Sequence, residues 1–312
     1  MPKRAVGKRR SSKLKARPAQ KPQATKEWTS ALARGREKAE LALARRQRRR
    51  AARGAVTGLR GLLVAEGDSW FDYPFFDVLQ ELEDGFNYRV ESVAHKGDTL
   101  EQMVYGRGQV DQLARALLKL KAAGKTPKAI LLSGGGNDIA GTEFAVLLNH
   151  KDSGLPILNE QVVAGVFDTR LRVAMIELAG AVTHLCHLTF GGALPILIHG
   201  YGHPVPDGRG YLGGFSFLPG PWLEPGFRLK GYTNLQECSD LMVTLIDRFN
   251  AVQAGIAGGP GLEHVRYLDL RDLLSNTLAD GAYKKAWGNE LHPTASGFRA
   301  VAGRFNEVLE AL

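Results

Sequence analysis

From Gly61 onward, short apolar runs alternate with longer segments that have the composition of helices. The apolar runs predict strands at 61–66, 88–94, 129–133, 194–199 and 265–269. The segments between and after them predict helices at 75–83, 100–122, 159–188, 234–254 and 296–311. This alternation is typical of βαβ units around a parallel sheet. It predicts one α/β domain at 55–312, a three-layer α/β/α sandwich with a central, mainly parallel sheet of five strands.

The stretch 199–232 has no regular period and is rich in glycine, proline and aromatic residues. It follows the carboxyl end of the fourth predicted strand, and open α/β sheets bind ligands at such ends. Long loops in compact domains are usually functional or disordered. Its aromatic rings are expected either to line an apolar pocket or to pack the loop onto the domain: Tyr201, Phe215, Phe217, Trp222 and Phe227. His199 and Tyr201 are candidate substrate contacts, whereas the spacing of Asp, Cys and His predicts no metal site.

Charge divides the chain into two parts. Residues 1–54 contain 19 Lys or Arg and 3 Asp or Glu, a net of +16, whereas 55–312 contain 22 and 29, a net of −7. Residues 1–25 are too polar to build a core and are predicted to be disordered, and the good helix formers of 26–53 predict a helix. Such an extension favours weak contact with polyanions or an anionic membrane surface. Without a recognised fold or interleaved aromatic residues, it does not predict specific nucleic-acid recognition.

The basic start of the chain is not followed by the apolar core of a secretory signal. No run approaches the roughly 18 apolar residues of a transmembrane helix. These patterns predict a cytoplasmic protein by default, with non-classical export left open. Cys186 and Cys238 are expected to be two free buried thiols, although they are able in principle to pair.

Candidate chemistry begins at Gly67-Asp68-Ser69-Trp70, directly after the first predicted strand. A serine at a strand end can be a nucleophile, although Asp and Ser are also common in turns and helix caps. Three further segments follow in order along the chain: Gly97-Asp98-Thr99, Gly134-Gly135-Gly136-Asn137-Asp138 and Asn289-Glu290-Leu291-His292-Pro293. The second and third segments follow the ends of the next two predicted strands. The last places a histidine just before the final predicted helix.

These four blocks resemble, in order, those of the SGNH hydrolases, also called GDSL esterases and lipases, over residues 61–312. The resemblance implies that Ser69 is the nucleophile, His292 the base, and Gly97 and Asn137 oxyanion donors. It also implies a flavodoxin-like fold and no cofactor. The chemistry needs the same residue types, because a hydroxyl that attacks an ester carbonyl requires a base and hydrogen-bond donors for the developing charge.

One position departs from the family's pattern. The family usually carries an aspartate three residues before the histidine, where this chain has the neutral Asn289. The amide oxygen of Asn289 is able to accept a hydrogen bond from the ring, but its NH2 group would favour the wrong tautomer. Glu290, Asp269, Asp272 and a main-chain carbonyl are the other candidates for orienting the ring, and we favour one of these.

The sequence therefore predicts a carboxylic ester hydrolase that acts on a small-molecule or lipid ester through an acyl-enzyme on Ser69, with Asp68 as a further candidate substrate contact. Two alternatives remain open. One is a degenerate SGNH-fold protein that binds an acylated or carbohydrate ligand without turnover, and the other is an interaction protein targeted by its basic extension.

Overall fold

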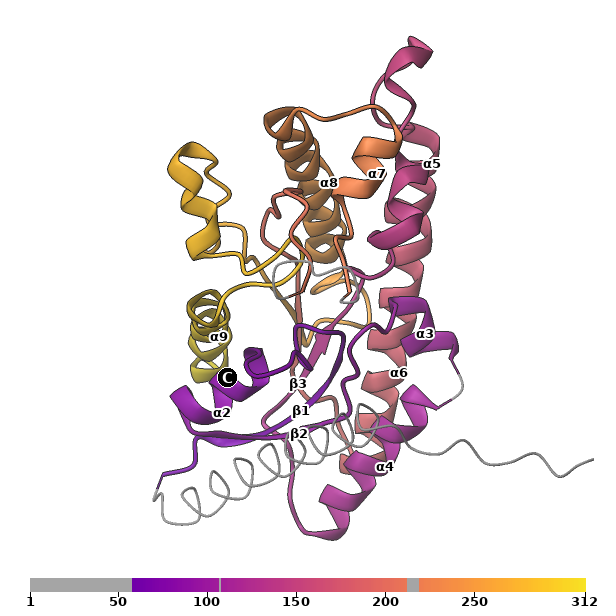
Figure 1. Cartoon of the computed structure of the whole chain (residues 1–312). Coiled ribbons are helices and arrows are strands. Elements are labelled where there is room, and N and C mark those ends of the chain that lie inside the picture. Colours follow the sequence, from indigo (N-terminus) through magenta and orange to yellow (C-terminus); the bar gives the residue numbers. More distant parts are fainter. Residues whose placement is uncertain (1–57, 107, 212–218) are drawn as a thin grey trace, which may run out of the picture. The chain divides into compact units, whose positions relative to one another are not determined.

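The computed structural model describes residues 58–106, 108–211 and 219–312 (Figure 1). The predicted extension at 1–54 lies outside these residues, as do Phe215 and Phe217. Five parallel strands form one sheet in the order β2-β1-β3-β4-β5, which confirms the predicted fold class. The strands are β1 (Gly61–Gly67), β2 (Tyr88–Ser92), β3 (Ala129–Ser133), β4 (Ile196–His199) and β5 (Val265–Leu268).

Helices follow each strand. The α-helices are α2 (Val78–Phe86), α3 (Leu100–Tyr105), α4 (Gln109–Ala122), α5 (Glu160–Ala164), α6 (Arg172–Phe190), α7 (Glu224–Leu229), α8 (Leu235–Ile256) and α9 (Ala295–Glu310). Short 3₁₀ turns lie at Gly141–Leu147, Lys151–Ser153 and Ala279–Lys285, and a π-helical segment at Gly165–Leu171 joins α5 to α6.

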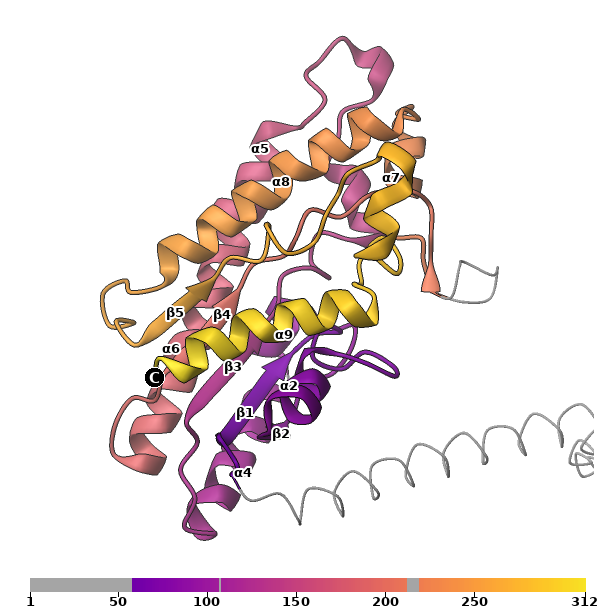
Figure 2. The same ribbon diagram turned by 90° about the vertical axis from the view of Figure 1, so that its left-hand side faces the viewer.

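The helices form two layers around the sheet. α2 and α9 pack against each other on one face, where Figure 2 shows both in front of the strands. On the other face α6 packs against α3, α4 and α8. Leu63, Val64 and Ala65 of β1 have no exposed surface, as expected for an interior strand of a parallel sheet that is covered on both faces.

The strand order brings three of the four blocks together. β1 lies between β2 and β3, and Gly67 at the end of β1 pairs with Ser133 at the end of β3. Because the strands are parallel, their carboxyl ends meet at one edge of the sheet. The segments that carry Ser69, Gly97 and Asn137 therefore leave the sheet side by side.

The helix predictions differ from the structure in places that have local causes. The single helix predicted at 100–122 is two helices, because α3 ends at Tyr105 and α4 begins after Gly108, whose φ of +126° favours glycine. The helix predicted at 75–83 begins later, at Val78, because the Asp77 side chain caps its N-terminus through the Gln80 N–H at 2.7 Å.

One helical stretch of the described residues, Glu160–Phe190, is long and apolar enough to cross a membrane, with a mean hydropathy of 1.4. No transmembrane helix was expected from the sequence. The stretch includes α6, which packs against three other helices of the domain. Cys186 on α6 and Cys238 on α8 are free and buried, which confirms the expectation for the two thiols.

Candidate active site

Ser69 lies in a tight turn directly after β1, and the buried Asp68 fixes that turn. Asp68 Oδ1 accepts a hydrogen bond from the Ser133 hydroxyl at 2.8 Å, and Oδ2 accepts one from the Tyr201 hydroxyl at 2.5 Å. The backbone of the following residues donates to Asp68 as well. Asp68 is thereby tied to β3 and to the segment after β4, and the Ser69 side chain is left partly exposed.

His292 meets this turn from the other end of the chain. Its Nε2 lies 2.8 Å from Ser69 Oγ, within the reach of a general base. The side chain is buried, and burial lowers the pKa of the imidazole to about 3. His292 is therefore neutral at neutral pH, and the hydroxyl of Ser69 donates to the lone pair of Nε2.

Asn289 orients the histidine ring. Its Oδ1 lies 3.0 Å from His292 Nδ1 and accepts hydrogen bonds of 2.9 Å from the backbone N–H groups of Leu291 and His292. A backbone N–H only donates, so the amide oxygen, and not the NH2 group, faces the ring. The ring proton consequently sits on Nδ1, which is the tautomer that leaves Nε2 free to act as a base.

Three aromatic side chains hold the histidine and its loop. The ring of Tyr73 stacks on His292 with centroids 4.1 Å apart, and the ring of Trp222 lies edge-on at 5.6 Å. The indole of Trp70 donates to the Leu291 carbonyl at 3.1 Å, which joins the serine turn to the histidine loop. Sequence reasoning missed Tyr73 and Trp70, because an aromatic residue near a motif gives no sign of which ring it will contact.

Tyr73 has a second contact that completes the arrangement. Its hydroxyl accepts a hydrogen bond of 3.0 Å from Asn289 Nδ2. Burial raises the pKa of Tyr73 to about 12, so the phenol stays neutral throughout the physiological range. Both ends of the Asn289 amide are thus occupied, with the oxygen on His292 and the nitrogen on Tyr73.

The preference for another group to orient His292 is wrong. The fully buried carboxylate of Glu290 instead accepts hydrogen bonds of 2.6 to 3.0 Å from four backbone N–H groups, those of Gly208, Trp222, Leu223 and Glu224. Burial raises the pKa of Glu290, against the lowering effect of these donors. Its role is to join the histidine loop to the long segment between β4 and α8.

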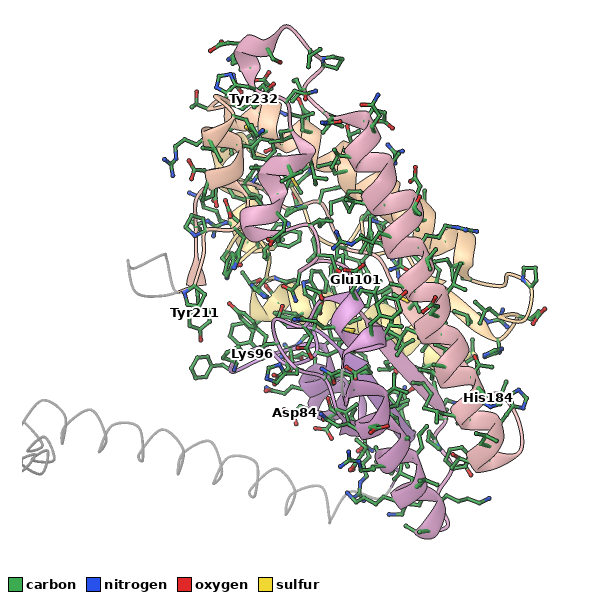
Figure 3. All side chains as sticks on the ribbon, turned by 90° about the vertical axis from the view of Figure 1, so that its right-hand side faces the viewer. Asp84, Lys96, Glu101, His184, Tyr211 and Tyr232 are labelled. Atoms are coloured by element: carbon green, nitrogen blue, oxygen red, sulfur yellow. The ribbon has the colours of Figure 1, made fainter. Side chains whose placement is uncertain are left out.

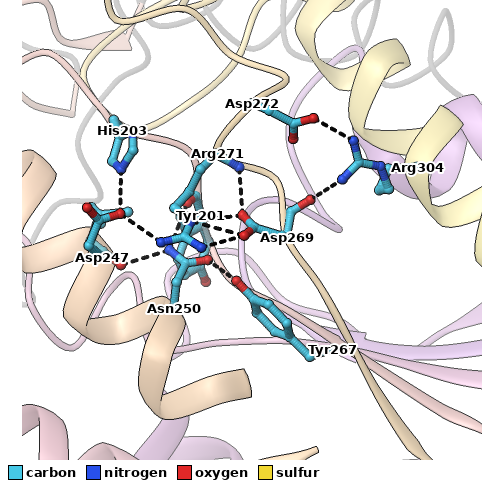
Figure 4. Close-up of polar contacts among 10 residues, drawn as sticks. Tyr201, His203, Asp247, Asn250, Tyr267, Asp269, Arg271, Asp272 and Arg304 are labelled. Atoms are coloured by element: carbon cyan, nitrogen blue, oxygen red, sulfur yellow. Dashed lines mark hydrogen bonds and ion pairs between the residues drawn. The ribbon is translucent and has the colours of Figure 1, made fainter. Parts of the chain in front are cut away.

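Asp269 and Asp272 do not reach the histidine either. Figure 4 shows Asp269 paired with Arg271, at 2.5 Å, and Asp272 paired with Arg304, at 2.8 Å. Arg304 also donates to the Asp269 carbonyl at 2.6 Å. Both carboxylates are thus engaged by arginine side chains.

Asn137 lies against the second block. Its Nδ2 donates to the Asp98 carbonyl at 2.9 Å, which joins the segment after β3 to the segment after β2. Among the described residues no acceptor is hydrogen-bonded to the backbone N–H of Ser69 or of Gly97. Both N–H groups thus remain available for an oxyanion.

The segment of Gly97 is held beside the serine turn. The N–H of His95 donates to the Gly67 carbonyl at 2.9 Å, and the N–H of Lys96 donates to Asp72 Oδ2 at 3.1 Å. Figure 3 labels Lys96 and also Tyr211, whose ring lies 5.8 Å from that of Tyr73. Gly97 itself has a φ of +89°, a conformation that favours glycine.

The candidate substrate contacts have different positions. Asp68 and Tyr201 are buried but line a cavity of about 40 Å³ beside Ser69. His199 does not line this cavity: its Nδ1 donates to the Gly200 carbonyl at 2.6 Å, and its ring stacks beneath Trp70. His199 is therefore a core histidine in this structure and not a substrate contact.

The aromatic rings predicted for the pocket likewise separate. Tyr201 lines the cavity, and Trp222 lies beside His292. Phe227 is buried against Phe144 at 4.8 Å and does not line the cavity. The two expectations for the rings of the segment 199–232 are thus each met in part. Tyr201 and Trp222 lie at the site, and Phe227 packs the segment onto the domain.

No protein-family model and no curated protein sequence matches this chain. A GDSL-like lipase from Bacteroides thetaiotaomicron is 12% identical, with a TM-score of 0.39 over 85% of this chain and 98% of that chain. An acetylxylan esterase from Geobacillus stearothermophilus, solved as a catalytic mutant, is 14% identical, with a TM-score of 0.41 over 81% and 95%. A protein from Arabidopsis thaliana is 13% identical, with a TM-score of 0.41, and the match covers 75% of this chain and 66% of that protein. Solved structures similar to this chain thus include GDSL-like lipases and an esterase, the kinds of protein that the four sequence blocks resemble.

Proposed function

We propose that this protein is a serine-dependent carboxylic ester hydrolase, with Ser69 as nucleophile and His292 as base. The observation that carries the proposal is the hydrogen-bonded chain from Ser69 Oγ to His292 Nε2, at 2.8 Å, and from His292 Nδ1 to Asn289 Oδ1, at 3.0 Å. A nucleophile and a base in contact, with the base oriented by a third group, are the signature of an activated serine.

In the first half of the proposed reaction, Ser69 Oγ attacks the carbonyl carbon of the ester and its proton passes to His292 Nε2. The carbonyl oxygen becomes an oxyanion. When the tetrahedral intermediate collapses, the bond to the alcohol oxygen breaks and the imidazolium returns the proton to that oxygen. The products of this half are the free alcohol and an ester of Ser69.

In the second half, water attacks the acyl-enzyme and His292 takes a proton from it. Collapse releases the carboxylic acid, and the proton on His292 returns to Ser69 Oγ. The donors proposed for both oxyanions are the backbone N–H groups of Ser69 and Gly97 and the side-chain amide of Asn137. One such donor is typically worth about 3 to 4 kcal/mol of barrier.

Asn289 takes the place of the usual carboxylate in this scheme. It stabilises the imidazolium by a hydrogen bond from Nδ1 and not by charge. In a serine protease the change from aspartate to asparagine costs about 10⁴ in turnover, because the asparagine favours the wrong tautomer. Here the backbone donors of Leu291 and His292 support the proposal, since they hold the amide oxygen toward the ring.

The proposal is tested with a fluorophosphonate probe, which reacts readily only with an activated serine. We expect covalent labelling of the folded protein on the peptide that contains Ser69. Ser69→Ala and His292→Ala should each abolish labelling and the hydrolysis of short p-nitrophenyl esters. A matched control is Ser92→Ala, which removes an exposed serine at the end of β2 and should leave both signals intact.

The effects of Ser69→Ala and His292→Ala on turnover should not be additive. If serine and histidine act as a unit, the double variant is about as inactive as either single one. Appreciable turnover in Ser69→Ala would remove the serine mechanism. A folded wild-type protein that is neither labelled nor active would favour the non-catalytic alternative.

A further inference from the structure

A small cavity adjoins the Ser69 side chain. Its volume is about 40 Å³, and both Ser69 and Asn137 line it. Apart from the residues around the serine turn and Tyr201, its walls are almost wholly apolar, and they include Ile139, Met242, Ile246 and Trp287. An apolar recess with a few polar groups at one end is the usual form of a small-molecule site.

The cavity lies on the acyl side of the proposed reaction. The leaving alcohol oxygen has to face His292 in order to receive its proton, and the carbonyl oxygen has to face the oxyanion donors. The His292 side chain does not line the cavity, so the alcohol does not depart into it. Asn137 lies at its polar end, and the apolar side chains that form the rest of its walls offer the oxyanion no donor. The substituent that remains on the carbonyl carbon, the acyl chain, is therefore the part that enters it.

The size of the cavity limits that chain. A water molecule needs about 10 to 15 Å³ of such a volume, so the cavity accommodates roughly three non-hydrogen groups. If the carbonyl carbon stays at Ser69, outside this count, the acyl chain has room for up to about three further carbon atoms.

The wall residues belong to the packed core of the domain. Met242 and Ile246 belong to α8 and are 1% and 4% exposed, and Trp287 is 1% exposed. Leu223, another wall residue, is held by the Glu290 carboxylate through its backbone N–H at 2.8 Å. A chain longer than the cavity has to displace packed side chains.

We propose that this cavity is the acyl subsite and that it restricts the enzyme to esters of short acids, from acetate to about butyrate. The proposal rests on the ester hydrolysis proposed above. It restricts the acid part of the substrate but not the alcohol part, because the alcohol departs on the side of His292, outside the cavity.

The first test compares p-nitrophenyl acetate, butyrate, hexanoate and octanoate with the full chain, corrected for spontaneous hydrolysis. We expect kcat/KM for acetate and butyrate to agree within about tenfold and octanoate to lie at least about 100-fold below butyrate, since misfit of a single methylene is worth about 10- to 200-fold. Octanoate as good as butyrate would overturn the acyl subsite. If no ester is hydrolysed and Ser69 is not labelled, the proposed function itself fails.

The second test changes the wall. Met242→Ala lengthens the cavity and should raise the ratio of octanoate to acetate kcat/KM by about tenfold. Leu245→Ala is the matched control, because Leu245 is buried on the same helix and does not line the cavity. It should leave the ratio unchanged. Equal shifts in both variants would mean general loosening of the fold and would overturn the assignment.

A third variant narrows the cavity and keeps the proposal testable if Met242→Ala fails to fold. Ala140 also lines the cavity, so Ala140→Leu should reduce kcat/KM for butyrate by about tenfold or more relative to acetate. An unchanged ratio of butyrate to acetate in this variant would place the acyl chain elsewhere.

Discussion

The amide oxygen of Asn289 lies 3.0 Å from Nδ1 of His292, where acyl-transfer enzymes with a catalytic triad have a carboxylate. Two backbone N–H groups hold this oxygen in place, and the Tyr73 hydroxyl accepts from the amide nitrogen. An asparagine oriented in this way supplies the correct tautomer without a charge. The site therefore separates two roles that a carboxylate combines, ring orientation and charge stabilisation.

The lack of charge predicts an unusual pH dependence. Burial lowers the pKa of His292 to about 3, and no carboxylate opposes this effect. The base form of His292 should persist down to about that pH. Between pH 4 and 8, kcat/KM should therefore not fall through protonation of His292. Steady-state kinetics across this range would measure it. A wild-type limb with a midpoint near 6 would contradict the assigned state of the ring.

Asn289→Asp should introduce a fall in kcat/KM at acid pH that the wild type lacks. A carboxylate beside Nδ1 favours the imidazolium, so the pKa of His292 rises and activity is lost as the pH falls through the new value. Near neutral pH, turnover should increase, because the carboxylate stabilises the imidazolium that forms as Ser69 attacks. Asn289→Ala is the comparison, and it should lower turnover by about 10² or more because it removes the group that orients the base. An aspartate variant no more active than wild type would show that charge is not limiting.

Tyr73→Phe isolates the outer contact of this arrangement. The ring that stacks on His292 remains, but the buried NH2 group of Asn289 loses its acceptor, which typically costs about 1 to 3 kcal/mol. We expect kcat to fall by about tenfold, with little change in KM. The pH profile should not shift, since Tyr73 is neutral up to a pKa of about 12. A change in KM alone would assign Tyr73 to substrate binding.

Asn137→Ala tests the role proposed for Asn137 as an oxyanion donor. Loss of one donor should reduce turnover by about 100- to 1,000-fold, with a smaller change in substrate affinity, because the donor acts mainly on the transition state. Steady-state kinetics on p-nitrophenyl acetate would measure both quantities. A rise in KM with turnover unchanged would make Asn137 a substrate-binding residue.

The sheet was predictable from the sequence, because buried parallel strands appear as continuous apolar runs. The position of three of the four blocks at strand ends was also predictable, because glycine follows each of these runs. The strand predicted at 129–133 agrees with β3 at both ends. Predictions were poorer where the local signal was mixed. The short helix α7, with Pro225 in its first turn and Gly226 in its interior, lies inside the segment 199–232, whose sequence has no regular period.

The orientation of His292 was not predictable, because it depends on contacts between distant segments. Glu290 is adjacent to Asn289 and charged, yet its carboxylate is engaged by backbone donors from positions 208 and 222–224. Asp269 is neutralised by Arg271, two residues along the chain, in a geometry that spacing alone does not reveal. Proximity in the sequence therefore favoured acids that do not orient the His292 ring.

The role of Glu290 gives a further prediction. Glu290→Gln keeps one acceptor oxygen but places an NH2 group against two of the four backbone donors. Because hydrogen bonds to charged groups are worth about 1.5 to 3 kcal/mol, we expect the free energy of unfolding to fall by about 2 to 4 kcal/mol. Turnover should fall as well, since the histidine loop loses its anchor.

The matched control for this change is Glu224→Gln in the same segment. Glu224 forms a partly exposed ion pair with Arg228 at 2.9 Å, and such pairs contribute about 0 to 1 kcal/mol. Urea denaturation of both variants, together with kcat on p-nitrophenyl acetate, would compare them. Equal small effects on stability and turnover would mean that the Glu290 carboxylate is not the link between the two segments.

Glu66 predicts how the stability of the fold depends on pH. The side chain is buried in β1, and among the described residues neither carboxylate oxygen has a hydrogen-bond partner. Burial, with the nearby Asp98 carboxylate as a smaller cause, raises the pKa of Glu66 from 4.5 to about 8. Between these values the folded state keeps the proton that the unfolded chain releases. The contribution of Glu66 to the free energy of unfolding is therefore complete below about pH 4.5 and is lost as the pH rises through about 8.

Glu66→Gln should remove this dependence, because glutamine has nearly the same shape and stays neutral. The variant should gain stability relative to wild type with increasing pH, by at most about 1.4 kcal/mol per pH unit between pH 5 and 8. Urea denaturation at each pH would measure the difference, with Glu177→Gln, an exposed glutamate of α6, as the control for the loss of one charge. Burial also raises the pKa of Asp77 to about 7 and of Asp138 to about 6, so both proteins should keep a slope from these groups at the acid end of the range. A variant whose stability parallels that of wild type at every pH would show that the Glu66 carboxyl is ionised in the folded protein.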